Sequence, residues 1–198
     1  MSCSCDNNPL ILPVGATGPQ GPQGVPGPGF VHYIGEQFGG GIIFHLYKDS
    51  LGVEHGLIVS TLDQSTGSSY SNIDATASGA ISTWDGQANT NILKTQGGAL
   101  GVGAWRLCDE YTVIVGSITY GDWYLPAIDE LNLLYNNRFN TNKTLATIAG
   151  TNQLVYESYW SSSEWSATSA FVFSFQPGVA SYNGVKGASY FVRAIRKF

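Results

Sequence analysis

The sequence predicts an α+β protein in two parts, an extended stalk near the N-terminus and a globular head of antiparallel strands with a few short helices. Three observations predict this architecture. Glycine recurs at every third position from Gly15 to Gly27, strand-like apolar runs stand at both ends of the remaining chain, and a helical apolar pattern lies between them. We therefore divide the chain into residues 1–14, 15–29 and 30–198.

The N-terminal peptide, residues 1–14, is polar except for a short apolar run between two prolines. That run consists of Leu10, Ile11 and Leu12, and the flanking prolines favour an extended backbone over a helix. Three apolar side chains without a core of their own indicate an anchor, which docks onto another protein or packs around the axis of an oligomer. A tail without fixed structure is the alternative.

Residues 15–29 have the pattern of a collagen triple helix, in which three extended chains share an axis where only glycine fits. The chain provides glycine at five consecutive triplets: Gly15, Gly18, Gly21, Gly24 and Gly27. A flexible linker would account for the proline and glycine content but not for the period. We predict a homotrimer with a stalk of about 45 Å, at roughly 3.1 Å per residue. Because so short a stalk hardly offsets the entropy of joining three chains, the head must hold it in register.

The head opens with two strand-like runs that predict a β-hairpin. Residues 42–47 and 57–62 are rich in β-branched and aromatic side chains, and turn-forming residues separate them. Residues 63–83, rich in serine, threonine and glycine, are expected to form a loop. Strand-like runs return from residue 159 to the end. Runs at both ends of a domain can meet in one antiparallel sheet, and we expect that arrangement here.

Helices are predicted in the middle of the head. The clearest covers residues 125–139, where apolar residues recur at helical spacing and acidic residues stand near the start. Asp85 is a candidate N-cap for a helix that ends near Gly97, and residues 102–111 form a further candidate. The apolar stripe of the clearest helix must face a sheet.

The composition excludes several classes of function. Charged residues make up 12% of the chain, the net charge is −5, and no basic run precedes the last six residues, so nothing marks a nucleic-acid partner. No stretch approaches 18 consecutive apolar residues, and we expect no membrane insertion. The first residues also lack the basic and apolar segments of a secretory leader. We therefore expect assembly in the cytoplasm and delivery to the exterior on a virion released by lysis.

Six motifs follow one another in the head: GGGIIFHL, GLIVSTLD, ANTNIL, WYLPAIDELNLLY, YWSSSEW and YFVRAIRKF. In this order, across residues 34–198, they resemble the C-terminal domain family of the collagen-like bacterial adhesins of the Lcl type, a domain also found at the ends of phage fibre proteins. The resemblance implies a fold similar to C-type-lectin-like and formylglycine-generating-enzyme-like domains, and a trimeric head that binds carbohydrate. The chain departs from the family at Ala127, where Ser or Thr often caps the helix, so the helix start must be satisfied by other groups.

We predict no catalytic residue, no cofactor and no metal site. The three histidines lack the spacing of a metal-binding motif, and no catalytic fingerprint occurs. Cys3, Cys5 and Cys108 are predicted to be free thiols, with cross-linking between chains through Cys3 or Cys5 as the alternative. The formylglycine-generating enzymes work through paired cysteines in their site, whereas this head has Cys108 alone.

Two groups of residues are candidates for specific roles. Trp84, Trp165 and Tyr182 stand among serine, asparagine and glycine and are candidates for an exposed surface on which a sugar ring stacks. Partial burial in loops is the alternative, because tryptophan is highly buried on average. Glu164 and Arg193 are predicted to form a structural ion pair between neighbouring strands.

Together these patterns predict a trimeric fibre protein on the surface of a bacteriophage virion. Residues 1–14 attach it to a capsid or tail protein, residues 15–29 form the stalk, and the head presents a carbohydrate-binding surface to a glycan of the host or its environment. Three copies of a weak site raise avidity without new contacts. A collagen-like adhesin on a bacterial cell surface is the alternative. An enzyme of the formylglycine-generating type is a third hypothesis, and it requires a metal or thiol centre.

Overall fold

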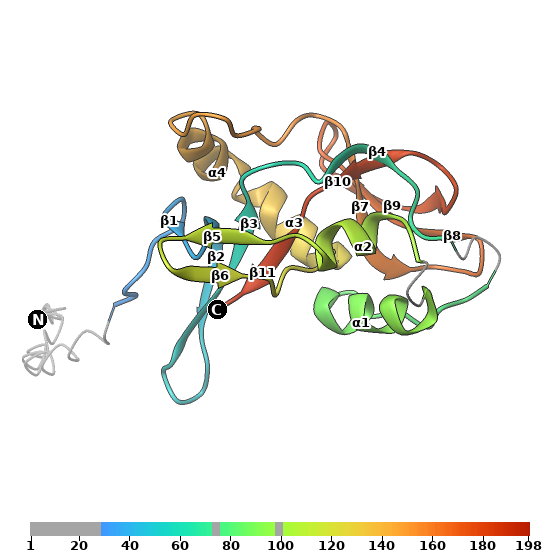
Figure 1. Ribbon diagram of the computed structural model, residues 1–198, viewed down its shortest axis with the longest axis horizontal. Coiled ribbons are helices and arrows are strands. Elements are labelled where there is room, and N and C mark those ends of the chain that lie inside the picture. Colours follow the sequence, from blue (N-terminus) through green and yellow to red (C-terminus); the bar gives the residue numbers. More distant parts are fainter. Residues whose placement is uncertain (1–28, 73–75, 98–100) are drawn as a thin grey trace, which may run out of the picture.

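The computed structural model describes residues 29–72, 76–97 and 101–198 (Figure 1). The predicted anchor, Leu10 to Leu12, and the predicted stalk glycines, Gly15 to Gly27, lie outside the described residues. Within them the chain is rich in antiparallel β-strands and has a few short helices. None of these helices combines the length and the apolar character that crossing a bilayer requires.

The first sheet joins the N-terminal hairpin to the last strand of the chain. Its strand order is β1 (Gln37–Phe38), β2 (Gly41–Lys48), β3 (Glu54–Ser60) and β11 (Ile195–Lys197), and all neighbours are antiparallel. The structure thus confirms the predicted hairpin and the predicted meeting of strands from the two ends of the head.

A second sheet has the strand order β4 (Ser65–Ser68), β10 (Tyr190–Val192), β7 (Ser158–Glu164), β8 (Ser169–Ser174) and β9 (Val179–Val185). Its neighbours are antiparallel except for β10 and β7, which run parallel. We expected a single sheet, and that prediction was wrong. The chain forms two because residues 193–194 carry it from β10 in the second sheet to β11 in the first. β4 also lies in a segment that we expected to be a loop.

The helices lie in the middle of the chain, as predicted. α1 (Gly86–Gly97), α2 (Ala104–Asp109) and α3 (Ile128–Asn136) match the three expected segments, and α4 (Arg138–Leu145) follows α3 as a separate helix. At the start of α1 the carboxylate of Asp85 accepts a hydrogen bond from the N–H of Ala88, which is the role predicted for it.

The start of α3 is satisfied without a capping side chain at Ala127. The N–H of Ala127 donates to the carboxylate of Glu130 at 2.8 Å, and the N–H of Ile128 donates to the Ser163 hydroxyl of β7 at 3.1 Å. The N–H of Asp129 donates to the carbonyl of Thr83. The free donors of the first turn therefore tie α3 to β7 and to the segment before α1.

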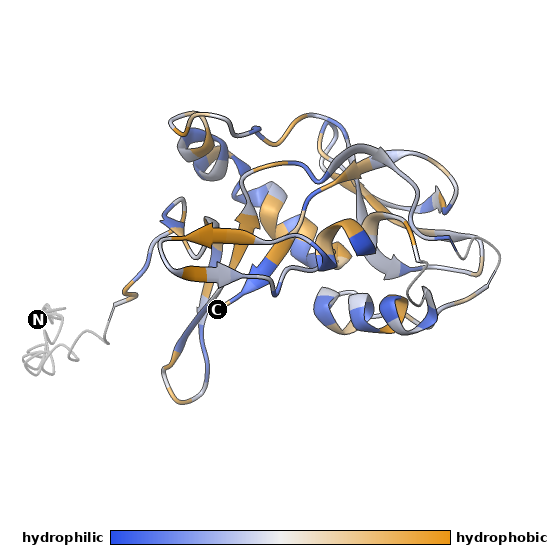
Figure 2. Ribbon diagram, viewed as in Figure 1, coloured by the Kyte–Doolittle hydropathy of each residue, from blue (hydrophilic) through white to orange (hydrophobic). Residues whose placement is uncertain are grey.

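The buried apolar side chains form two clusters, one that includes Trp123 and Trp160 and one that includes α3. α3 packs against β2, β7 and β8, and its apolar stripe is visible in Figure 2. Leu131 and Leu134 on this stripe are fully buried. Trp123 and Trp160, which we expected in the core, are 2% and 0% exposed. Burial of each such side chain contributes about 1.5–3 kcal/mol, so the two sheets and α3 form one cohesive head.

A third, two-stranded sheet stands apart from the other two. It consists of β5 (Val113–Val115) and β6 (Ile118–Tyr120) in antiparallel register. This hairpin projects from the body of the head toward the end at which the described chain begins (Figure 1). No pattern in the sequence predicted this hairpin.

Candidate functional site

Three aromatic side chains meet on the surface of the second sheet. The ring centroids of Trp165 and Tyr182 lie 5.1 Å apart, and those of Trp165 and Phe171 lie 5.6 Å apart in an edge-to-face arrangement. Trp165 and Tyr182 are each 58% exposed, whereas Phe171 packs against the core around α3. We call Trp165, Tyr182 and Phe171 the aromatic platform.

A tight turn between β7 and β8 fixes the Trp165 side of the platform. The backbone N–H groups of Trp165 and Ser166 both donate to the carbonyl of Ser169, at 3.1 and 3.0 Å. The hydroxyls of Ser166 and Ser169 lie 2.7 Å apart, and the N–H of Thr168 donates to Ser166. Serine and threonine bond locally to the backbone in this way when they stabilise turns. The polar surroundings that made Trp165 a candidate are thus the turn that presents it.

A bulge in β9 brings Tyr182 to the same surface. Ala170 of β8 is opposite Gly184 and Val172 is opposite Ser181, so β9 has one residue more than β8 across this interval. In a regular strand successive side chains point to opposite faces, but Tyr182 and its neighbour Asn183 are both exposed. Bulges re-aim side chains in this manner.

Polar groups border the exposed rings. Asn183 and Ser181 are hydrogen-bonded to each other beside Tyr182, and the hydroxyls of Ser166 and Thr168 belong to the turn that follows Trp165. Two exposed aromatic faces bordered by hydroxyl and amide groups can take the apolar face of a sugar ring and hydrogen-bond its hydroxyls.

A buried ion pair is formed by Glu164, the residue that precedes Trp165, and Lys186. The carboxylate of Glu164 accepts hydrogen bonds from the Lys186 ammonium and from the N–H groups of Ser78 and Gly79. Burial raises the pKa of Glu164, but these hydrogen bonds outweigh it and hold the pKa below its ordinary value. The Lys186 ammonium also donates to the carbonyl of Thr76 at 2.8 Å. The pair thus ties the end of β7, the residue that follows β9 and residues 76–79 together.

The predicted ion pair between Glu164 and Arg193 is not formed, and that prediction was wrong. Arg193 pairs instead with Asp63, with 3.4 Å between guanidinium and carboxylate. The reason is the parallel register of β10 and β7, in which Phe191 is opposite Tyr159. In this register Arg193 corresponds to Ser161, in the middle of β7. Glu164 lies at the end of β7, about 10 Å beyond Ser161 at roughly 3.3 Å per residue.

Trp84 does not join the platform. It is 70% exposed and stands just before α1, where Asp85 forms an ion pair with Lys197. The ring contacts found among the described residues link Trp165 to Phe171 and Tyr182 but do not include Trp84. The structure therefore brings two of the three predicted aromatic residues together. It adds Phe171, whose place in the alternating run of 169–175 is the signal that could have identified it.

The serine run of β7 has a structural role. Ser161, Ser162 and Ser163 are fully buried. Ser163 donates to the carbonyl of Ser82 at 2.7 Å, Ser161 donates to the carbonyl of Phe171 at 2.9 Å, and Ser162 accepts from the amide of Asn89. Hydroxyls engaged in this way satisfy buried backbone and side-chain groups and are not presented to a ligand.

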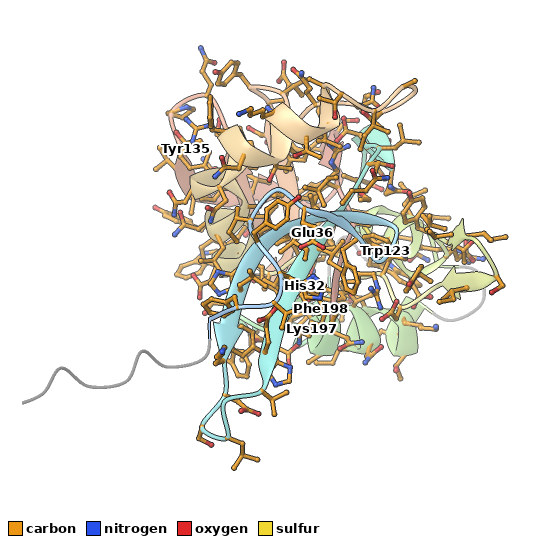
Figure 3. All side chains as sticks on the ribbon, turned by 90° about the vertical axis from the view of Figure 1, so that its left-hand side faces the viewer. His32, Glu36, Trp123, Tyr135, Lys197 and Phe198 are labelled. Carbon is orange, nitrogen blue, oxygen red and sulfur yellow. The ribbon has the colours of Figure 1, made fainter. Side chains whose placement is uncertain are left out.

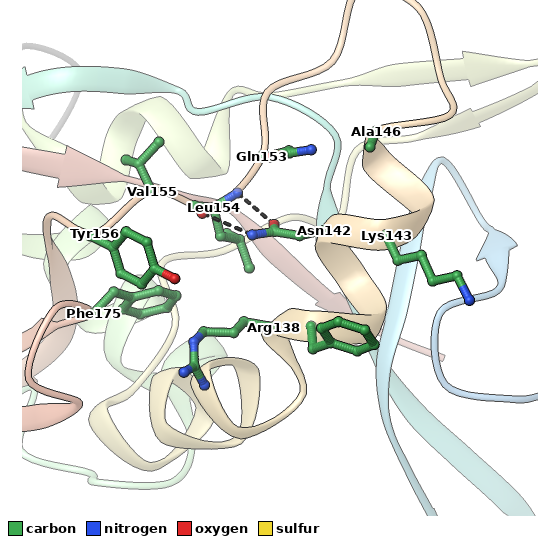
Figure 4. A pocket seen from close by; sticks show the side chains of 10 residues that line it. Arg138, Asn142, Lys143, Ala146, Gln153, Leu154, Val155, Tyr156 and Phe175 are labelled. Atoms are coloured by element: carbon green, nitrogen blue, oxygen red, sulfur yellow. Dashed lines mark hydrogen bonds between the residues drawn. The ribbon is translucent and has the colours of Figure 1, made fainter.

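A pocket of about 630 Å³ lies on another side of the head, between α4 and the segment before β7 (Figure 4). The amide of Asn142 spans its wall, donating to the carbonyl of Leu154 and accepting from its N–H. Arg138 and Lys143 give the lining a positive charge, and Phe139 and Tyr156 are exposed at 75% and 71%. No pattern in the sequence predicted this pocket.

Titratable groups elsewhere are engaged in local contacts. His32 lies 3.1 Å from Glu36 and next to the ring of Phe198 (Figure 3). Cys108, the one cysteine in the part of the chain that the structure describes, is buried, and burial raises the pKa of its thiol well above the ordinary value. The described residues contain no group of three or more His, Cys, Asp or Glu side chains placed to hold a metal ion.

Comparison with known proteins gives a likeness of fold. No family model matches the chain, and no curated protein matches it. Among solved structures the head is similar to a fimbrial protein from Bacteroides ovatus, with a TM-score of 0.59 and 16% sequence identity. The similarity covers 78% of this chain and 43% of that protein, so the chain spans less than half the length of its structural neighbour.

Proposed function

We propose that the chain is a homotrimeric fibre protein of a bacteriophage virion, whose head binds carbohydrate through the aromatic platform. Residues 1–14 dock onto a capsid or tail protein, and residues 15–29 form a triple-helical stalk. The assignment of the head to the C-type-lectin-like class rests on the sequence resemblance and belongs to the same proposal. The observation that supports a carbohydrate ligand is the contact between Trp165 and Tyr182, both 58% exposed.

An exposed aromatic pair leaves apolar ring area in contact with water, which is unfavourable in free energy unless a ligand covers the rings. Tryptophan and tyrosine are usually buried to a large extent, and here a turn and a bulge hold both rings outward. The rings offer apolar area, and the surrounding Ser, Thr and Asn groups offer hydrogen bonds. Three heads on one stalk would carry three such platforms, so modest affinity at each gives firm attachment to a surface dense in glycans.

A glycan array tests the ligand class. Trp165→Ala should weaken binding of the bound glycan by about 2 kcal/mol, roughly thirtyfold, the typical cost of removing a central aromatic contact. Trp84→Ala is the matched control, because Trp84 is even more exposed but makes no ring contact with the platform. Equal loss in both variants, or loss only at Trp84, would refute the assignment of the site.

A bacterial cell-surface adhesin is the second candidate function. The observation that favours it is the similarity of fold to a protein named as fimbrial. Antibody against residues 30–198, used to label both phage particles and host cells for electron microscopy, distinguishes the two carriers. Labelled virions support the fibre, and label confined to cell surfaces supports the adhesin.

A further inference from the structure

The β5–β6 hairpin exposes apolar side chains on both of its faces, because Val115 is paired with Ile118 on one face and Ile114 lies opposite Thr119 on the other. Ile114, Val115 and Ile118 are 71%, 50% and 55% exposed, and residues 112–121 contain no charged side chain. In Figure 2 β5 is coloured as apolar along its length. Apolar side chains exposed on both faces of one projecting element indicate an interface.

The fold holds this hairpin rigidly in place. The guanidinium of Arg196 binds the carboxylate of Asp122 through two hydrogen bonds, of 2.7 and 2.9 Å, and lies 4.6 Å from the centre of the Tyr120 ring. Val113 packs so closely on the β1–β2 turn that a side-chain carbon on Gly40 would lie 3.1 Å from it. An isolated two-stranded hairpin is marginally stable, so these contacts order the hairpin in advance and lower the entropic cost of binding through it.

A second exposed apolar surface lies where the chain enters the head. It consists of Phe30, Val31, Tyr33, Leu51 and Val53, each at least 51% exposed, and we call it the stalk-proximal surface. Its two segments are joined by hydrogen bonds, since the N–H groups of Val31 and His32 donate to the carboxylate of Glu54.

Both surfaces lie at the same end of the head, but on different sides of it. In Figure 1 the β5–β6 hairpin and the β2–β3 turn both reach the end at which the described chain begins. In Figure 3, which looks onto that end, the hairpin projects to one side and the β2–β3 turn reaches the bottom. A closed ring of three identical subunits needs two different surfaces on each subunit, because each copy contacts the next head to tail.

We propose that the β5–β6 hairpin of one copy packs on the stalk-proximal surface of the next, and that three such contacts hold the heads of the trimer together. The inference rests on the proposed homotrimer. The partner that covers these surfaces is a second copy of this chain, because the glycine repeat ends only a few residues before Phe30. Three chains that leave a common axis at this point bring the hairpin of one copy close to the stalk-proximal surface of the next. A stable interface buries about 800 Å² on each partner, so in each contact the parts of the head next to the hairpin and next to the stalk-proximal surface are covered as well.

The test uses the full chain with Ile114→Asp and Ile118→Asp combined. The matched control combines Val179→Asp and Val185→Asp, which place two charges on exposed residues of β9, 53% and 61% exposed in the wild type. Light scattering coupled to size exclusion at micromolar concentration measures the mass, and near-ultraviolet circular dichroism verifies the folded head. We expect a trimer for the wild type and the control, and a folded monomer for the Ile114 and Ile118 variant. A trimer of unchanged melting temperature in that variant overturns the inference but leaves the proposed trimer standing. A monomeric wild type overturns both.

A second measurement does not depend on how the charged variant folds. Benzoylphenylalanine in place of Ile114 forms a covalent bond with its nearest neighbour on irradiation. We expect a cross-link between chains that maps to residues 30–33 or 49–54 of another copy. A cross-link within one chain, or one to any other surface, overturns the assignment of the contact.

Discussion

Replacing Glu164 with Gln should destabilise the head by about 3–5 kcal/mol, because the substitution leaves a buried ammonium without its partner carboxylate. The side chains of Glu164 and Lys186 are 2% and 1% exposed, so water cannot take over the role of the lost charge. Because the pKa of Glu164 lies below its ordinary value, this stabilisation is present above about pH 4.5 and is lost as the pH falls through the lowered pKa.

The size of the effect makes it easy to measure. In a domain of 150–250 residues a change of 1 kcal/mol shifts the melting temperature by about 2–4 °C, so Glu164→Gln should lower it by about 6–20 °C. Differential scanning calorimetry at neutral pH and fixed protein concentration gives the value directly. Replacing both partners, with Glu164→Gln and Lys186→Met, removes the unpaired charge and should recover much of the loss.

The matched control is the same chemical change at an exposed ion pair. Glu110 pairs with Arg106 one helical turn away, and its side chain is 60% exposed. Glu110→Gln should therefore cost at most about 1 kcal/mol. If Glu164→Gln melted within the range of Glu110→Gln, the assignment of Glu164 and Lys186 as a stabilising buried pair would be refuted.

Two further predictions concern buried titratable groups. Burial raises the pKa of Glu130 to about 7, against hydrogen bonds from Ala127 and Tyr124. The folded carboxyl therefore keeps its proton between about pH 4.5 and 7 while the unfolded one has lost it, so the free energy of unfolding should fall by up to about 1.4 kcal/mol per pH unit across this window. Urea unfolding of Glu130→Gln should show a flatter pH dependence than the wild type, and an unchanged slope would contradict the shift. Cys108 should resist alkylation in the native protein and react only after unfolding, as mapped by mass spectrometry; rapid native labelling would contradict its burial.

Elements that depend on local patterns could be predicted from the sequence. Two runs rich in β-branched and aromatic residues, separated by turn formers, predicted β2 and β3, and a stripe at helical spacing predicted α3. The cap at Asp85 was predicted from the residue type and its position alone. The β5–β6 hairpin was missed because its strands are three residues long, too short to show a period.

Contacts between residues far apart in the chain could not be predicted in the same way. The partners of Glu164 and Arg193 follow from the parallel register of β10 on β7, which no local pattern marks. The exposure of Trp165 and Tyr182 has a local cause, in a serine-rich turn and a polar strand, and the sequence pointed to both. Their contact depends on one extra residue in β9 relative to β8, a bulge that only the paired strands reveal.

The mass of the full chain in dilute solution tests the central claim most directly. If glycine at every third position allows three chains to share an axis, sedimentation equilibrium at low micromolar concentration should give three times the 21.2 kDa of one chain. A mass of 21.2 kDa, unchanged as the concentration is raised, would contradict the trimer and with it the fibre.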